Sequence, residues 1–138
     1  MYNSAVGDHV FFYGTLMSPF NRPGRLRITP KLVYKGRGTI NGALFDLGIY
    51  PAAIPVDDSA TVWGELYETS DPLAVLAVLD EIEGHRPSEP ARSLYNRVLV
   101  DVTREDGSVT KAWTYFYNAP LGHAQRIVSG DYLKHLGL

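Results

Sequence analysis

Glu83 is the residue whose type and position most strongly indicate chemistry. The sequence predicts a helix with one apolar face, formed by Leu73, Leu76, Leu79 and Ile82. At roughly 100° per residue, Glu83 falls about 20° from Leu76 and about 40° from Leu79, so it points with the apolar residues. Burial disfavours the charged form of a carboxyl group, which then becomes a competent general acid/base near neutral pH. Glu83 is therefore either an acid/base catalyst or, if the helix has already ended there, a side chain that caps the helix or forms an ion pair at its rim.

Two further acids lie close to Glu83 in the sequence. Glu81 points to the opposite side of the helix, so we expect it in solvent. Asp80 lies one turn before Glu83, where the two side chains can be neighbours. A structural hydrogen bond from Asp80 to a loop is the favoured interpretation.

A second candidate site follows the first predicted strand, where residues 10–16 read Val-Phe-Phe-Tyr-Gly-Thr-Leu. The apolar run ends abruptly at Gly14 and Thr15, and such a break leaves backbone N–H groups without partners in a sheet. Successive N–H groups form a concave cradle for a carboxylate or an oxyanion, and glycine lets a ligand approach closely. A plain turn after a strand is the alternative interpretation.

Tyrosine is frequent, with nine in 138 residues, and Tyr95, Tyr115 and Tyr117 fall on two strongly predicted strands. A phenol can orient a bound carboxylate or amine. Most tyrosines of this kind are core or interface residues whose hydroxyls bind other protein groups. The sequence leaves both roles open.

Metal and thiol chemistry are not expected. The four histidines lack a metal-ligand spacing such as His-x₃-His, so we expect no metal site. The chain has no cysteine, which excludes disulfides, thiolate catalysis and cysteine–zinc sites. Nucleophile-elbow, phosphate-loop and dinucleotide-binding motifs are absent from the sequence.

The composition is that of an ordinary globular protein, with 45% hydrophobic and 20% charged residues. A length of 138 residues suits one domain, which we assign to residues 1–138. The net charge of −2 provides no basic field for nucleic acid, and no apolar run approaches the roughly 20 residues that span a bilayer. No N-terminal signal sequence is recognisable, so we expect a cytoplasmic protein with neither a nucleic-acid nor a membrane partner.

Short strands and one solid helix dominate the predicted secondary structure. The elements are a strand at 9–13, a bent strand at 31–40, a hairpin turn at Asn41-Gly42 leading into 43–47, a loop at 48–55, a strand at 60–69, a helix at 72–83, a hairpin of strands 95–103 and 109–117, and a short helix within 124–136. This pattern indicates the α+β class. Many glycine-interrupted strands favour a small closed or nearly closed β-barrel.

Several segments, taken in order, carry a family resemblance. They are Phe12-Tyr13-Gly14-Thr15-Leu16, Tyr50-Pro51-Ala52, Val62-Trp63-Gly64-Glu65-Leu66-Tyr67, Leu79-Asp80-Glu81-Ile82-Glu83-Gly84, Tyr95-Asn96-Arg97, Ala112-Trp113-Thr114-Tyr115 and Gly130-Asp131-Tyr132. The chain resembles the gamma-glutamylcyclotransferase-like family, which includes the avirulence-induced-gene-like proteins. The resemblance implies a small mixed β-barrel of about six strands with flanking helices.

The resemblance also implies a site between the loop after the first strand and the helix end. The resemblance implies that Glu83 is the acid/base and that the backbone of Gly14, Thr15 and Leu16 binds the γ-glutamyl portion of the substrate. It also implies that Tyr95 and Tyr115 line the pocket. The loop at residues 85–93 is longer than in other members. That departure leaves the size of the substrate open.

The activity that this resemblance implies is an intramolecular acyl transfer that needs no cofactor. The α-amine of a small γ-glutamyl substrate attacks its own γ-carbonyl and releases 5-oxoproline and an amine, while N–H groups from Tyr13 to Leu16 hold the carboxylate or the oxyanion. We expect a monomer or a homodimer. The alternatives are a non-catalytic module of the same fold that binds a small carboxylate, and an interaction domain that uses exposed tyrosines.

Overall fold

Two sheets and two α-helices make up residues 8–20 and 29–138, which are the residues that the computed structural model describes. The strands are β1 (His9–Phe12), β2 (Leu32–Asn41), β3 (Ala43–Asp46), β4 (Pro51–Ile54), β5 (Thr61–Thr69), β6 (Tyr95–Arg104), β7 (Val109–Tyr117) and β8 (Gln125–Arg126). The helices are α2 (Pro72–Glu83) and α3 (Tyr132–Leu136), with 3₁₀ turns η1 (Ser18–Phe20), η2 (Thr29–Lys31) and η3 (Pro90–Arg92).

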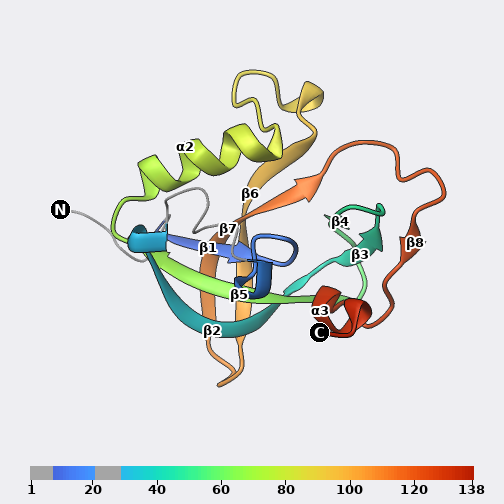
Figure 1. Cartoon of the computed structure of the whole chain (residues 1–138), viewed down its shortest axis with the longest axis horizontal. Coiled ribbons are helices and arrows are strands. Elements are labelled where there is room, and N and C mark those ends of the chain that lie inside the picture. The colour runs from blue at the N-terminus through green and yellow to red at the C-terminus, as the bar shows by residue number, and fades with distance from the viewer. Residues whose placement is uncertain (1–7, 21–28) are drawn as a thin grey trace.

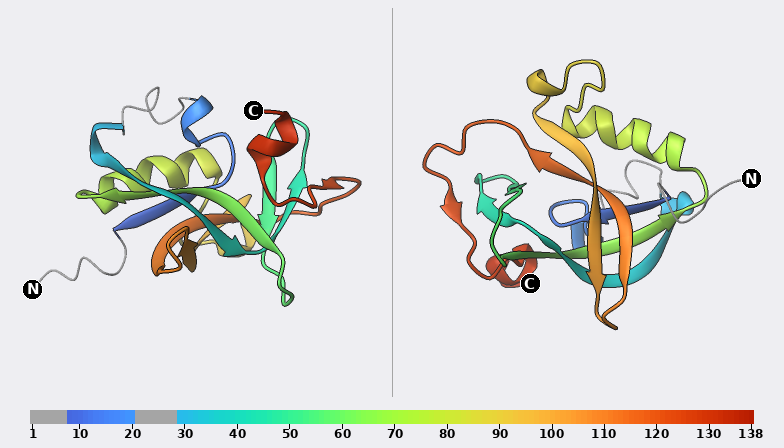
Figure 2. Two further views of the ribbon diagram at one scale, coloured as in Figure 1. Left: turned by 90° about the horizontal axis from the view of Figure 1, so that it is seen from below. Right: turned by 180° about the vertical axis from the view of Figure 1, so that it is seen from behind.

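Five of these strands close into a barrel in the order β1-β5-β2-β6-β7 (Figure 1). The pairs are antiparallel except that β1 runs parallel to β7, where Val10 pairs with Trp113. The predicted α+β class and mixed barrel are confirmed, with five strands in the barrel where about six were expected. The remaining strands form a separate sheet in the order β4-β3-β8, which lies beside the barrel together with α3 (Figure 2).

The longer predicted strands are confirmed. The bend expected in the second strand is a shift of register in β2 between Tyr34 and Gly36, and Gly36 has a φ of 107°. Such a bulge increases the local twist and helps a sheet to curl into a barrel. The predicted hairpin is the β6–β7 pair, with Tyr95 opposite Tyr117 and Thr103 opposite Val109.

Two local predictions around β3 are wrong. Asn41-Gly42 does not form a hairpin turn, since β2 pairs with β5 and β6 whereas β3 pairs with β4 and β8. Gly42 lacks the positive φ that the usual Asn-Gly hairpin turn needs, and it marks the point where the chain leaves the barrel. The predicted loop at 48–55 contains β4, which begins at Pro51. A proline fits there because β4 is an edge strand and Pro51 is its first residue.

The short helix predicted within residues 124–136 is confirmed as α3. Asp131 caps this helix by accepting a hydrogen bond from the N–H of Lys134 at 3.3 Å. Residues 125–126 form β8 instead of helix, because they pair with β3.

Helix α2 lies along the side of the barrel beside β1 (Figures 1 and 2). Val75, Leu76 and Leu79 bury its apolar face, but Leu73 is 84% exposed, so its assignment to that face is wrong. The buried face is centred on Leu79, and Leu73 lies about 120° from that residue around the helix. Within the described residues, none of the helices has both the length and the apolar character needed to cross a bilayer.

Truncation of Leu79 and of Leu73 tests which of the two side chains lies on the buried face of α2. We expect Leu79→Ala to lower the free energy of unfolding by about 3 kcal/mol, because Leu79 is fully buried and its removal leaves a cavity. Leu73→Ala is the matched control and should change it by less than about 0.5 kcal/mol. Urea unfolding measures both, and equal losses would contradict the assignment.

Candidate active site

The C-terminal end of α2 brings Glu83 to the barrel. Gly84 ends the helix in the left-handed conformation (φ 67°), which glycine adopts without steric cost, and its N–H points to the last carbonyls of the helix. The N–H of Leu94 donates to the carbonyl of Gly84 at 3.1 Å and ties this end to the start of β6. Glu83, the last helical residue, is half-buried and lines a cavity.

This cavity has a volume of about 210 Å³. It is smaller than the roughly 300–1,000 Å³ of sites for drug-sized ligands, so it suits a small molecule or one end of a larger one. Its lining contains all seven residues that the family resemblance places at the site, Tyr13, Gly14, Thr15, Leu16, Glu83, Tyr95 and Tyr115, together with Phe11, Phe12, Tyr50, Pro51, Ile82, Leu94 and Thr114. Tyr117, the third tyrosine of the two late strands, does not line it. Among the described lining residues, Glu83 is the one charged side chain.

Three of the four tyrosines that line the cavity donate their hydroxyl protons to other parts of the protein. Tyr13 donates to the carbonyl of Tyr115 at 2.6 Å, and Tyr95 donates to the carbonyl of Pro51 at 3.1 Å. Tyr115 donates to Oδ1 of Asp80 at 2.6 Å. A phenol has a single proton to donate, so these oxygens have only acceptor capacity left.

These phenols also stay neutral across the physiological range. Burial is the largest cause that raises the pKa of Tyr13, Tyr95 and Tyr115 far above the ordinary value of about 10, and the charge of Glu83 raises all three pKa values further. Hydrogen bonding to Asp80 adds to the effect at Tyr115. The phenols of Tyr13, Tyr95 and Tyr115 therefore do not ionise at neutral pH. The charge of Glu83 lies close enough to raise the pKa of each.

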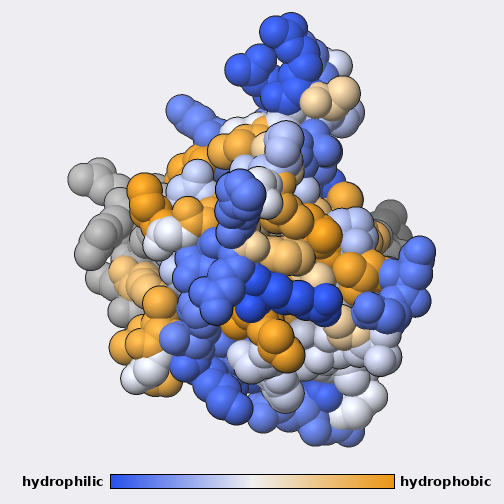
Figure 3. All heavy atoms as spheres, turned by 90° about the vertical axis from the view of Figure 1, so that its right-hand side faces the viewer, coloured by the Kyte–Doolittle hydropathy of each residue, from blue (hydrophilic) through white to orange (hydrophobic). Residues whose placement is uncertain are grey.

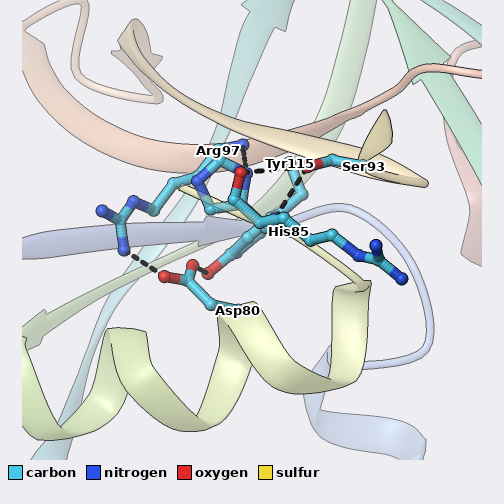
Figure 4. A network of polar contacts seen from close by, with 6 residues as sticks. Asp80, His85, Ser93, Arg97 and Tyr115 are labelled. Atoms are coloured by element: carbon cyan, nitrogen blue, oxygen red, sulfur yellow. Dashed lines mark hydrogen bonds and ion pairs between the residues drawn. The ribbon is translucent and has the colours of Figure 1, made fainter. Parts of the chain in front are cut away.

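Asp80 ties the end of α2 to the barrel (Figure 4). Besides the Tyr115 hydroxyl on Oδ1, its Oδ2 accepts an ion-paired bond from Arg97 at 2.7 Å, and that guanidinium lies 5.1 Å from the centre of the Trp113 ring. The expected structural hydrogen bonding of Asp80 is confirmed, but its partners lie on strands and not in a loop. Its carboxylate binds Arg97 and Tyr115, which face each other across β6 and β7.

The loop after β1 forms the other side of the cavity. β1 pairs with β5 as far as Phe12, and the chain then turns back, with the N–H of Met17 donating to the carbonyl of Gly14 at 3.0 Å. A Cβ on Gly14 would lie 2.9 Å from Cγ of Pro51, so the loop approaches β4 more closely than a larger residue allows. Met17 is fully buried and anchors the turn, while residues 13–16 line the cavity.

The loop between α2 and β6 projects from the body as a mostly hydrophilic protrusion (Figure 3). At its base the Ser93 hydroxyl accepts a 2.7 Å bond from the N–H of Arg86 and donates to the carbonyl of Glu89 at 3.2 Å. None of the described residues 85–93 lines the cavity, but Leu94, which follows the loop and is 42% exposed, does. The cavity is therefore lined by the residue that follows the loop, Leu94, and not by the loop itself.

A group of three potential metal ligands occurs among the described residues, at the other end of β1 from the cavity. Ligand atoms of Asp8, His9 and Glu68 lie within 4.8 Å of one another. Nδ1 of His9 is 2.9 Å from Asp8 and Nε2 is 3.6 Å from Glu68, so both ring nitrogens already face carboxylates. This group contributes nothing to the cavity, and the expectation of no metal site stays a prediction.

Sequence reasoning did not assign Tyr50 and Leu94 to the cavity. Tyr50 belongs to a segment that carried the family resemblance, and its ring centre lies 6.3 Å from that of Tyr95. That segment was the available signal. Leu94 follows a loop without periodicity, and nothing in the sequence marks it.

Sequence comparison decides the family. Residues 10–134 match the model of the family described as "Gamma-glutamyl cyclotransferase, AIG2-like". The chain belongs to this family. The matched segment runs from β1 into α3 and includes the whole lining of the cavity.

Gamma-glutamyl cyclotransferase relatives resemble the chain in sequence and in fold. The gamma-glutamylcyclotransferase family protein YtfP of Escherichia coli K12 is 38% identical over 93 residues, which cover 67% of this chain and 69% of YtfP. The solution structure of E. coli ytfP has a TM-score of 0.65 at 30% identity and covers 92% of this chain and 97% of that one. The crystal structure of YkqA from Bacillus subtilis has a TM-score of 0.69 at 25% identity and covers 93% of this chain, which spans only 40% of YkqA.

The buried phenols predict a loss of stability at high pH. Their pKa values are raised in the folded protein, whereas in the unfolded chain they ionise near pH 10, so their contribution is fully present below pH 10 and is lost as the pH rises above it. Urea unfolding should show a fall of about 1 kcal/mol per tyrosine for each pH unit above 10. Tyr95→Phe should reduce this slope. An identical slope in the wild-type protein and in Tyr95→Phe would show that the pKa of Tyr95 is not raised in the folded protein.

Proposed function

We propose that the protein is a γ-glutamylcyclotransferase that acts on a small γ-glutamyl amine or peptide and releases 5-oxoproline and the free amine. The observation that carries the proposal is a single cavity lined by Glu83, by residues 13–16, and by Tyr95 and Tyr115. Family membership supports the same reaction class. The small volume of the cavity fits the glutamyl end of the substrate, with the amine half toward Tyr50 and Leu94 at the partly exposed rim.

The reaction is an internal exchange of one amide bond for another. Glu83 takes a proton from the α-ammonium group, and the nitrogen lone pair then forms a bond to the γ-carbonyl carbon. The bond from this carbon to the amine half breaks, and Glu83 returns the proton to the departing nitrogen. The new ring nitrogen then gives up a second proton, which the released amine takes up to leave as an ammonium ion. Nothing is oxidised or reduced, so orientation and proton transfer are the catalytic tools, and the proposed chemistry needs no cofactor.

The electrostatics of the cavity support this assignment of roles. The phenols of Tyr95 and Tyr115 stay neutral and donate their protons elsewhere, so proton transfer at neutral pH falls to Glu83. The Glu83 carboxylate and the phenol oxygens form an acceptor-rich side that suits the α-ammonium group. Backbone N–H groups of residues 13–16, on the other side, bind the α-carboxylate or stabilise the oxyanion.

Replacement of the carboxylate tests the proposal. Glu83→Gln keeps the shape but removes the base, and we expect the rate of 5-oxoproline release to fall by about 10²–10⁴-fold. Glu81→Gln is the matched control, since Glu81 is an exposed acid on the same turn of α2 and should keep wild-type activity. Mass spectrometry of 5-oxoproline over a panel of γ-glutamyl amines measures both.

Two outcomes would contradict the proposed enzymatic function. Undiminished turnover in Glu83→Gln would remove Glu83 from the mechanism. Tight binding of γ-glutamyl compounds by the wild-type protein in calorimetry, with no turnover across the panel, would instead favour a non-catalytic binding module.

A further inference from the structure

Glu65 is a buried carboxylate outside the cavity lining. It lies on β5, opposite Phe12 of β1, and only 5% of its surface is exposed. It shares its face of the strand with Tyr67, which is also buried. A carboxylate removed from water is strongly unfavourable unless donors surround it, so the partners of Glu65 show what this residue is for.

Within residues 8–20 and 29–138, three donors bind this carboxylate, and two of them belong to one residue. The backbone N–H of Ser18 donates to Oε1 at 2.7 Å, and the hydroxyl of Ser18 donates to Oε2 at 2.8 Å. The hydroxyl of Tyr67 donates to Oε1 at 2.9 Å. Charge-assisted bonds of this length are strong, and the two-pronged contact with Ser18 fixes both the position and the direction of the chain there.

Ser18 stands at the far end of the loop that lines the cavity. It directly follows Met17, whose N–H closes the turn on the carbonyl of Gly14. At the near end, the Tyr13 hydroxyl is held by the carbonyl of Tyr115. The segment that lines the cavity is therefore fixed at both ends, by β7 on one side and by Glu65 on the other.

We propose that Glu65 is a positioning residue: by binding Ser18 through both carboxylate oxygens, it holds residues 13–16 in the conformation that binds the γ-glutamyl portion of the substrate. This inference rests on the proposed function. It extends the site to a side chain that does not reach the cavity.

Glu65→Gln tests the requirement for a carboxylate, because glutamine has the same length but only one acceptor oxygen, and its NH₂ group faces the donors of Ser18. We expect the KM for a γ-glutamyl amine to rise by about tenfold and kcat to stay within about twofold, as when binding common to the ground and transition states is lost. Ser18→Ala removes one of the two prongs and should raise KM by about threefold. Ser18 is exposed, so this variant tests the contact even if Glu65→Gln fails to fold.

Tyr67→Phe is the matched control. It removes a hydrogen bond from the same carboxylate but leaves both bonds to Ser18, so KM and kcat should stay within about twofold of wild type. A role of Glu65 in general stability alone would instead give similar KM changes in Tyr67→Phe and Glu65→Gln at equal loss of stability.

Amide hydrogen exchange of residues 14–18 measures how firmly the contact between Glu65 and Ser18 holds the loop, and it needs no enzymatic activity. We expect at least about tenfold faster exchange there in Glu65→Gln and Ser18→Ala, with unchanged exchange in β6 and β7. Wild-type KM and wild-type exchange in both variants would overturn the proposal. A wild-type protein that releases no 5-oxoproline would overturn the proposed function, and the exchange rates would still decide whether Glu65 holds the loop.

Discussion

The attachment of the end of α2 to the β6–β7 hairpin is the constraint on which the site depends. Asp80 makes it by accepting from Arg97 and Tyr115, two residues that face each other across the paired strands. The ion pair is largely shielded, with side chains 23% and 15% exposed, so water and salt screen it less than a solvent-exposed pair. Glu83 lies one turn further along the helix, so the bonds at Asp80 also fix Glu83 relative to the cavity.

The polar groups around the cavity divide into two kinds. Tyrosine hydroxyls and Asp80 bind one another or backbone carbonyls and hold elements together, as Tyr13 does when it links the loop after β1 to β7. Glu83 is the one charged side chain among the described residues that line the cavity. Rigid neutral phenols around one carboxylate keep the local charge low, so the interaction of Glu83 with a cationic group is little screened.

Features set by neighbours in the sequence were predictable, and features set by distant segments were not. The 3.6-residue period and the Gly84 stop placed Glu83 on the inner side of α2, because both are properties of the helix itself. The partners of Asp80 lie 17 and 35 residues away, and those of Glu65 include Ser18 at 47 residues, so no local pattern revealed them. The edge strand at Pro51 was missed for the same reason, since its pairing with β3 outweighs the low strand propensity of proline.

The wall of the cavity is built from two sheets that share no ladder among the described strands. The barrel supplies the loop after β1 and the late tyrosines, whereas the small sheet supplies Pro51, with Tyr50 in the turn just before it. That turn, closed by a bond from the N–H of Leu47 to the carbonyl of Tyr50, carries Ile49 out into solvent at 84% exposure. Grafting a different β3–β4 connection would therefore reshape the rim of the cavity while the ladders of the barrel strands are kept, which makes this turn a place where engineered specificity can begin.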